Sequence, residues 1–399
     1  MIVKHISLTN FRLYARLEID LKRGLVIVQG DNAQGKTSLL EALYFLATAH
    51  SPHTNADRQI IRWGAEEDGP FPYAMLKANI ERSDGSHLLE MMIQKGEGGR
   101  IKKEIRIDRT PRRSVDLIGQ LSVVLFLPSD VELVYGPPAA RRDFIDAALS
   151  QVDAEYVRAL DRYEKALSQR NALLRQSGER RIDPDELAVW DEQLAPDGVA
   201  ISLARRRALS ELAQLALPLH RELSNAAEFL QIMYQPSFDA TQPNAVDEAY
   251  QIGFDTTQPP AGMNEADLCK AFQTALTTRR SEELARGVTL TGPHRDEFRF
   301  IANGMDLGEF GSRGQQRTAV LALKLAQVAW MRERTKEEPI LLLDEVLAEL
   351  DPHRRRCLLR HIGDSQQTVI TTTDIHQLER EQLPDAASLT VRLGVISTS

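Results

Sequence analysis

The segment GDNAQGKT at residues 30–37 decides the fold, because it matches the phosphate-binding P-loop pattern at every defined position. The apolar run LVIV at residues 25–28 precedes it, and residues 38–49 (SLLEALYFLATA) follow it with apolar side chains at helical spacing. Strand, glycine-rich loop and helix together form the context in which a P-loop operates. This context argues against the alternative, a chance glycine turn before a helix.

Each residue type in this loop suits the binding of a nucleoside triphosphate. Glycines let backbone N–H groups converge on the phosphates at the positive end of the following helix. Lys36 can neutralise the β- and γ-phosphate oxygens, and the Thr37 hydroxyl can ligate Mg²⁺. The predicted ATP-binding residues of this segment are Gly30, Asp31, Asn32, Ala33, Gln34, Gly35, Lys36, Thr37 and Ser38.

Two carboxylates follow a second apolar run, at residues 340–343. Asp344 is expected to hold the Mg²⁺ shell, and Glu345 is suited to polarise the water that attacks the γ-phosphate. An apolar strand that ends in Asp-Glu is weak evidence by itself. Beside a P-loop it becomes the Walker B pattern, which makes Glu345 and Lys36 the predicted catalytic residues.

A second candidate phosphate-binding face lies at residues 310–318 (FGSRGQQRT), about thirty residues before Walker B. The apolar pattern that follows predicts a helix from about Gly314, so Ser312 lies near its N-terminus. For an isolated serine, simple N-capping is the more economical explanation. The order of the motifs, however, is the order that an ATP-binding-cassette signature requires.

Apolar patterning divides the chain into two kinds of structure. Alternation predicts three strands within residues 2–28, three more that form an antiparallel lobe (73–80, 87–93 and 101–107), and strands again at 288–291, 298–301 and 368–373. Between 138 and 286 the pattern is helical, with one stripe from Ile145 to Leu174 on a single helix. Prolines at 184, 196, 218, 236, 243, 259 and 260 predict that this insert is broken and folds back on itself.

These motifs resemble the RecF family, cassette ATPases of bacterial recombinational repair. The residues that carry the resemblance span nearly the whole chain: LTNFR at 8–12, residues 30–43, FLPSD at 126–130 through Gly136 to Arg141-Arg142, LTGPHRD at 290–296, and the signature at 310–318. The resemblance implies an α/β fold, an ABC-type P-loop ATPase head with a mixed central sheet and an antiparallel β lobe, plus an inserted, mainly α-helical arm. We expect the head at residues 1–137 and 287–399, and the arm at 138–286.

The resemblance also implies roles for further residues. Ser312, Gly314 and Gln315 would contact ATP held by a second copy, so that ATP joins two chains head to tail. Asp351 resembles the D-loop aspartate, Arg12 resembles an arginine that reaches the phosphates, and Asp130 stands where relatives place a Q-loop. Thr372 stands where many cassette ATPases carry a switch histidine. A threonine cannot carry charge, so we expect slow turnover.

DNA contacts are predicted from local basic clusters, since the net charge is −8. Residues 100–113 hold seven basic residues against two acidic ones, although a solvated hairpin edge explains the charge equally well. Without a sequence-reading motif, contacts should be mainly to phosphates and salt-dependent. The candidates are Lys102, Lys103, Arg112, Arg113, Arg205, Arg206 and Arg207.

The resemblance implies an ATP- and Mg²⁺-dependent DNA-binding protein, a weak DNA-stimulated ATPase that acts at gaps or single-strand to double-strand junctions. Its partners would be RecR, RecO and RecA, in replication restart and the SOS response. A transporter ATPase subunit or a small-molecule kinase would also carry a P-loop, but a kinase leaves the signature unexplained and neither needs so long an arm. The chain lacks a bilayer-spanning apolar stretch and a signal-like start, which predicts a cytoplasmic protein. The resemblance implies that it is nucleoid-associated. Cys269 and Cys357 predict reduced thiols without a zinc site.

Overall fold

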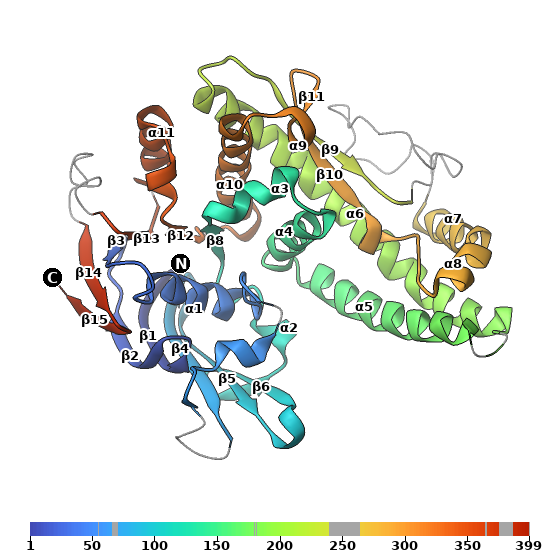
Figure 1. Ribbon diagram of the computed structural model, residues 1–399, viewed down its shortest axis with the longest axis horizontal. Helices are drawn as coiled ribbons and strands as arrows, with labels where there is room; N and C mark the ends of the chain where they lie inside the picture. Colours follow the sequence, from blue (N-terminus) through green and yellow to red (C-terminus); the bar gives the residue numbers. More distant parts are fainter. Residues whose placement is uncertain are drawn as a thin grey trace. The chain divides into compact units, whose positions relative to one another are not determined.

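The computed structural model describes residues 1–54, 56–65, 71–178, 180, 182–238, 264–363, 365–374 and 386–398, and it forms two compact units (Figure 1). The first comprises residues 1–130 and 327–399, and the second comprises residues 131–326. This division differs from the expected boundaries at 138 and 286, because the signature segment lies in the second unit. The physical reason is that strand β10 (Glu297–Ala302) pairs with β9 (Leu230–Gln235) of that unit.

A six-stranded mixed sheet, in the order β15-β14-β3-β13-β12-β8, carries the two ATPase motifs. The strands from β8 to β14 all pair in parallel, and only β15 runs antiparallel to its neighbour. The carboxyl ends of β3 and β12 therefore lie at the same edge of the sheet. The strands are β3 (Gly24–Gln29), β8 (Val123–Phe126), β12 (Ile340–Asp344), β13 (Gln367–Thr372), β14 (Ala387–Arg392) and β15 (Val395–Thr398).

A second six-stranded sheet, in the order β2-β1-β4-β5-β6-β7, is antiparallel throughout and confirms the predicted lobe. Helix α1 (Lys36–Thr48) buries Leu39, Leu43 and Leu46 in the core that it shares with strands of both sheets. The predicted fold class is thus confirmed for this unit. The strands are β1 (Ile2–Phe11), β2 (Tyr14–Asp20), β4 (Tyr73–Arg82), β5 (Gly85–Lys95), β6 (Ile101–Ile107) and β7 (Thr110–Arg112).

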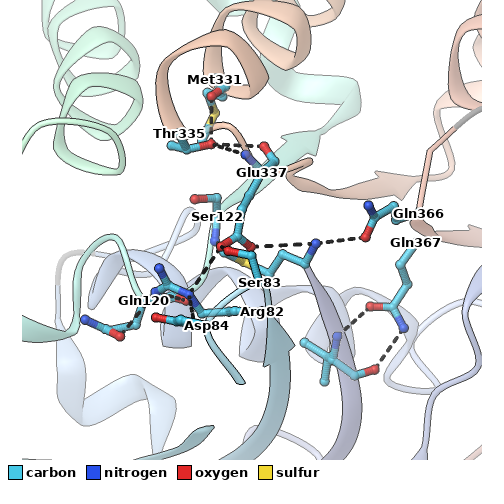
Figure 2. A network of polar contacts seen from close by, with 12 residues as sticks. Arg82, Ser83, Asp84, Gln120, Ser122, Met331, Thr335, Glu337, Gln366 and Gln367 are labelled. Atoms are coloured by element: carbon cyan, nitrogen blue, oxygen red, sulfur yellow. Dashed lines mark hydrogen bonds and ion pairs between the residues drawn. The ribbon is translucent and has the colours of Figure 1, made fainter. Parts of the chain in front are cut away.

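A network of polar contacts joins the two sheets near the start of the chain (Figure 2). The Gln367 side-chain amide of β13 accepts from Val3 N at 2.8 Å and donates to Val3 O at 2.9 Å, so it mimics a strand partner for β1. Ser83, in the β4–β5 turn, donates to Glu337 Oε1 at 2.8 Å. Glu337 follows α10 (Arg313–Thr335), the helix of the signature motif, which contributes residues to both units.

The second unit contains two helices where one was predicted from the apolar pattern. The apolar stripe from Ile145 to Leu174 is divided between α4 (Pro138–Ser150) and α5 (Ala154–Arg175). Asp153 causes the break, because its carboxylate accepts from Glu155 N at 2.9 Å and Tyr156 N at 3.1 Å and so begins a new helix. Apolar periodicity alone does not reveal such an N-cap.

Helix α6 (Pro184–Leu223) contradicts the prediction that prolines break the arm. It runs for 40 residues, about 60 Å, through Pro196 and Pro218. A helix tolerates the loss of an occasional backbone hydrogen bond when its faces are packed, and α6 packs against α5, α7 and β9. The reversal occurs before Pro184, where Asp183 caps the helix. Pro236 follows β9, whereas Pro243, Pro259 and Pro260 lie outside the described residues.

The remaining elements complete the two units. Residues 288–291 are not a strand, since Thr289 instead bonds to Asn171 through its N–H and its hydroxyl. In the described part of the chain, no helix is long and apolar enough to cross a membrane. The other elements are α2 (Ser114–Leu117), α3 (Glu132–Tyr135), α7 (Glu265–Thr278), α8 (Arg280–Arg286), β11 (Met305–Asp306), α9 (Leu307–Phe310) and α11 (Pro352–Gly363).

Candidate nucleotide-binding site

The P-loop connects β3 to α1 through a backbone shape that depends on glycine. Gly35, at the N-cap of α1, has φ of 116°, a conformation that side chains rarely adopt. A β-carbon on Gly30 would lie 2.5 Å from the carbonyl oxygen of Val391 on β14. Both positions therefore disfavour larger residues, so the backbone of the loop requires glycine at these two places.

Two hairpin turns that the sequence did not single out support the loop. From the first residue of β2, next to the β1–β2 turn, the Tyr14 hydroxyl donates to Gly35 O at 2.8 Å, and burial raises the pKa of this phenol. From the β14–β15 turn, Leu393 N donates to Gln34 Oε1 at 2.6 Å and Gly394 N donates to Gln34 O at 3.1 Å. The second pair of contacts joins segments more than 350 residues apart, so no local pattern could predict it.

Lys36 lies among acceptors at the inner side of the loop. Its Nζ donates to Gly30 O at 2.7 Å and Asp31 O at 2.9 Å, and it forms an ion pair with Glu345 Oε1 at 3.0 Å. The Lys36 side chain is only 4% exposed. The structure thus brings the two predicted catalytic residues into direct contact.

The Walker B aspartate is held by two threonine hydroxyls. Thr37 Oγ1 donates to the Asp344 carboxylate, with 2.9 Å to Oδ2 and 3.1 Å to Oδ1. From β13, Thr371 Oγ1 donates to Asp344 Oδ1 at 2.7 Å. Thr371 also accepts a hydrogen bond from Glu345 N at 3.0 Å. Thr371 directly precedes Thr372, the residue that was predicted to stand at the switch position.

Thr37 and Asp344 fit a magnesium ion. Mg²⁺ prefers oxygen ligands and is usually held by one or two protein oxygen ligands together with substrate phosphates. The structure brings one hydroxyl and one carboxylate together next to the P-loop, in agreement with that requirement. Mg²⁺ bound there would offset negative charge on the phosphates.

Arg12, which was predicted to reach the ATP phosphates, contacts other residues of this chain in the structure. Its guanidinium binds Glu41 of α1, with Nε–Oε2 at 2.8 Å and Nη2–Oε1 at 2.5 Å, and donates to Gln59 O at 2.8 Å. Glu41 is buried and needs a cationic partner. Arg12 therefore links the β1–β2 turn to α1 in the structure, and its contact with the phosphates stays a prediction.

The signature motif is exposed at the N-terminus of α10. Ser312 N donates to Gln315 Oε1 at 2.8 Å, and Gln315 N donates to Ser312 Oγ at 3.3 Å, a reciprocal cap. Gln315 Nε2 also donates to Glu228 Oε1 at 2.7 Å, so it is held within its own unit. Phe310, two residues before Ser312, is 70% exposed. An N-cap and a phosphate contact are both compatible with this geometry.

Asp351 and Thr372 are occupied by local hydrogen bonds. Asp351 caps α11 by accepting from His353 N at 2.9 Å and Arg354 N at 3.1 Å. The Thr372 hydroxyl donates to Asp374 O and accepts from Asp374 N, both at 3.1 Å. Asp130 closes a similar turn, since its carboxylate accepts from Leu127 N at 2.7 Å.

Two of the predicted DNA-binding residues are structural. Arg205 is buried and binds Asp146 in a bidentate ion pair, with 2.8 Å from Nε and 2.7 Å from Nη2, so its assignment to DNA was wrong. Lys103 is mostly buried, pairs with Asp57 at 3.1 Å and donates to Ala49 O. The basic count of a segment does not reveal such partners.

The other candidates retain exposed surface. The Lys102 side chain is 69% exposed, although it pairs with Glu104 at 2.6 Å. Arg112, Arg113 and Arg207 are exposed, and Arg206 is partly buried. Arg113 pairs with Asp116 at 3.3 Å, which reduces the positive potential of the lobe. These residues stay candidates for phosphate contacts.

Residues 2–390 match the family described as RecF/RecN/SMC N terminal domain. The chain is 44% identical over 395 residues to the DNA replication and repair protein RecF of Chloroflexus aurantiacus, covering 96% of each chain. It is 37% identical over 399 residues to the RecF of Geobacillus thermodenitrificans, covering 100% of this chain and 99% of that one.

Solved structures agree with these relatives. The recombination mediator protein RecF with ATP, of the RecFOR pathway, superimposes with a TM-score of 0.83 at 28% identity, over 100% of this chain and 97% of that one. The Smc head domain of Pyrococcus furiosus, bound to the C-terminal domain of ScpA, superimposes with a TM-score of 0.52 at 13% identity, over 100% and 95%. The second likeness concerns the fold alone.

Proposed function

The chain belongs to the RecF family of the RecF/RecN/SMC ATPases, and from this we propose that it hydrolyses ATP slowly to control its hold on DNA during recombinational repair. The observation that carries the proposal is the contact of Lys36, Thr37, Asp344 and Glu345 at one edge of the mixed sheet. These are the residue types that bind a triphosphate, hold its metal and activate a water molecule.

Binding of ATP would exchange the partners of Lys36. The β- and γ-phosphates carry more charge than one carboxylate, so they compete with Glu345 for the ammonium group. The exchange releases the Glu345 carboxylate, which can then accept a proton from the water that attacks the γ-phosphate. Because Thr371 to Thr373 supply no cationic side chain, we expect slow turnover.

We further propose that two copies share each ATP. Ser312 is exposed at a helix N-terminus, where an anion is favoured, and Phe310 leaves an apolar side chain beside it. A symmetric dimer would bury two ATP molecules between the P-loop of one copy and the signature of the other. Hydrolysis would then release the dimer from DNA.

The pathway is proposed from the relatives. One RecF structure is described as a recombination mediator of the RecFOR pathway. We propose that this chain likewise acts at gaps or junctions with RecO and RecR, helps RecA to load, and does so near the nucleoid in the cytoplasm. DNA would stimulate its weak ATPase activity. A transporter subunit or a metabolite kinase explains the P-loop but not the RecF-like match over almost the whole chain.

Sedimentation velocity with and without ATP-Mg²⁺ tests the shared site. We expect the wild type to shift from monomer to dimer with ATP, and Lys36→Arg and Ser312→Arg to stay monomeric. Ser86→Arg, at an exposed position of β5, is the matched control and should dimerise. Dimerisation of Ser312→Arg would contradict the shared site. DNA binding of the wild type that ignores ATP would contradict ATP-controlled binding.

A further inference from the structure

We propose that Thr371 is a positioning residue for ATP hydrolysis, which fixes the metal-binding carboxylate and the catalytic glutamate with one hydroxyl group. Thr371 lies at the carboxyl end of β13 and is 1% exposed. The strand stands between β3 and β12, so this side chain lies between the two motif-bearing strands. The inference rests on the proposed function.

The first contact fixes Asp344. Thr371 has a single hydroxyl proton and two acceptors in reach, Asp344 Oδ1 at 2.7 Å and Leu343 O at 3.4 Å. The shorter distance and the negative charge assign the proton to the carboxylate. Thr37 binds the same carboxylate from α1. If Thr37 turns its oxygen to Mg²⁺, Thr371 still restrains Asp344.

The second contact fixes Glu345. Glu345 has φ of 53° and ψ of 12°, a left-handed conformation that is strained for a residue with a side chain. Its N–H donates to Thr371 Oγ1 at 3.0 Å, and this bond holds the turn that directs Glu345 away from β12. One hydroxyl therefore donates to the metal ligand and accepts from the residue that activates water.

The other two threonines of β13, Thr372 and Thr368, make neither of these contacts. The Thr372 hydroxyl is engaged with Asp374 in a turn. Thr368 is buried on the same strand, and its Oγ1 has no hydrogen-bond partner among the described residues. Thr368 is therefore a matched control, since Thr368→Val removes a buried hydroxyl without removing a contact of the site.

The test measures nucleotide affinity by the fluorescence of mant-ATP in EDTA and across a Mg²⁺ titration, together with steady-state hydrolysis and the melting temperature. For Thr371→Val we expect unchanged affinity in EDTA, since Lys36 and the loop are intact. The Mg²⁺ concentration at half-saturation should rise about 10- to 100-fold, the usual effect of losing a partner of a metal ligand. The value of kcat should fall about tenfold with KM for ATP little changed, because one hydrogen bond to a charged group is lost.

Thr371→Ser, which keeps the hydroxyl, should restore both values, and Thr368→Val should match the wild type. The proposal is overturned if Thr371→Val shows the Mg²⁺ dependence of Thr368→Val, or if Thr371→Ser fails to restore it. Failure of the wild type to bind ATP with Mg²⁺ would instead contradict the proposed function, so the two failures are distinguishable.

Discussion

Lys36 Nζ lies 3.0 Å from Glu345 Oε1, so the cation of the P-loop and the carboxylate that follows Walker B neutralise each other. The two residues are far apart in the chain and meet because β3 and β12 end at the same edge of one sheet. The same pair therefore restrains Glu345 before nucleotide binding and can release it afterwards. Substitution of Glu345 tests both the restraint and the release.

Glu345→Gln should separate binding from hydrolysis. The amide cannot accept a proton from water, so we expect single-turnover hydrolysis to fall by about 10²- to 10⁴-fold. ATP affinity should be equal or higher, because the phosphates no longer compete with a carboxylate for Lys36. Rapid-quench hydrolysis and mant-ATP binding measure the two quantities. Glu349→Gln, at an exposed position nearby, is the control, and a near-normal rate in Glu345→Gln would contradict the assignment.

Gly198→Ala should destabilise the second unit although it adds a better helix former. Alanine in an open helical position gains about 1 kcal/mol over glycine. Here a β-carbon would lie 2.6 Å from Phe272 Cε1 and 3.2 Å from Tyr163 Cε2, both buried. We expect a net loss of about 1–3 kcal/mol in the free energy of unfolding, measured by urea denaturation. Gly363→Ala, a helical position with open space around it, should show no loss.

The sequence predicted the ATPase motifs because their chemistry is local. Residues 30–37 must supply glycine, lysine and threonine at fixed spacing, and a buried apolar strand must lead directly into them. The lobe strands were equally predictable, since alternation survives in β4, β5 and β6. The contacts that support the P-loop were not predictable, because Tyr14 and Leu393 reach it only in the folded chain.

Several features of the helical arm could not be predicted from apolar and charge patterns. Pro196 lies inside α6 because packing against α5 and α7 outweighs one missing hydrogen bond. Asp153 begins α5 soon after α4 ends, without disturbing the apolar stripe. In the run at 205–207, one arginine turns inward to Asp146 while Arg207 stays exposed. A count of charges cannot distinguish the buried arginine from the exposed one, because the partner of Arg205, Asp146, lies 59 residues away in the sequence.

Arg205→Ala should lower stability rather than DNA affinity. The change leaves Asp146 and the buried Asp296 without their shared cation, and Pro293 O without its donor. Removing one member of a buried ion pair costs about 3–5 kcal/mol, which thermal and urea unfolding would detect. Arg207→Ala, at an exposed position, should change stability by less than about 0.5 kcal/mol. Equal stability of the two variants would contradict the structural role.

His294 should make the second unit sensitive to acid. Its Nε2 faces the carbonyl of Thr289 at 3.1 Å, so Nε2 carries the proton, and Nδ1 accepts from the Tyr163 hydroxyl at 2.7 Å. This neutral tautomer satisfies both partners. Burial lowers the pKa of His294 to about 4, with smaller contributions from Arg295, Arg142 and Arg170.

The direction of the pH effect on stability follows from the protonation of His294 in the folded and the unfolded chain. The unfolded chain takes up a proton at His294 near pH 6.5, whereas the folded chain does so only near pH 4. The contribution to stability is therefore complete above about pH 6.5 and declines as the pH falls towards 4, by up to about 3 kcal/mol. Urea unfolding of the wild type and His294→Gln from about pH 7.5 to about pH 4.5 measures it. The variant should be less stable at neutral pH but should lose less stability on acidification, whereas His53→Gln, at an exposed position, should follow the wild type. Parallel pH curves for His294→Gln and the wild type would show that the buried imidazole does not titrate in this range.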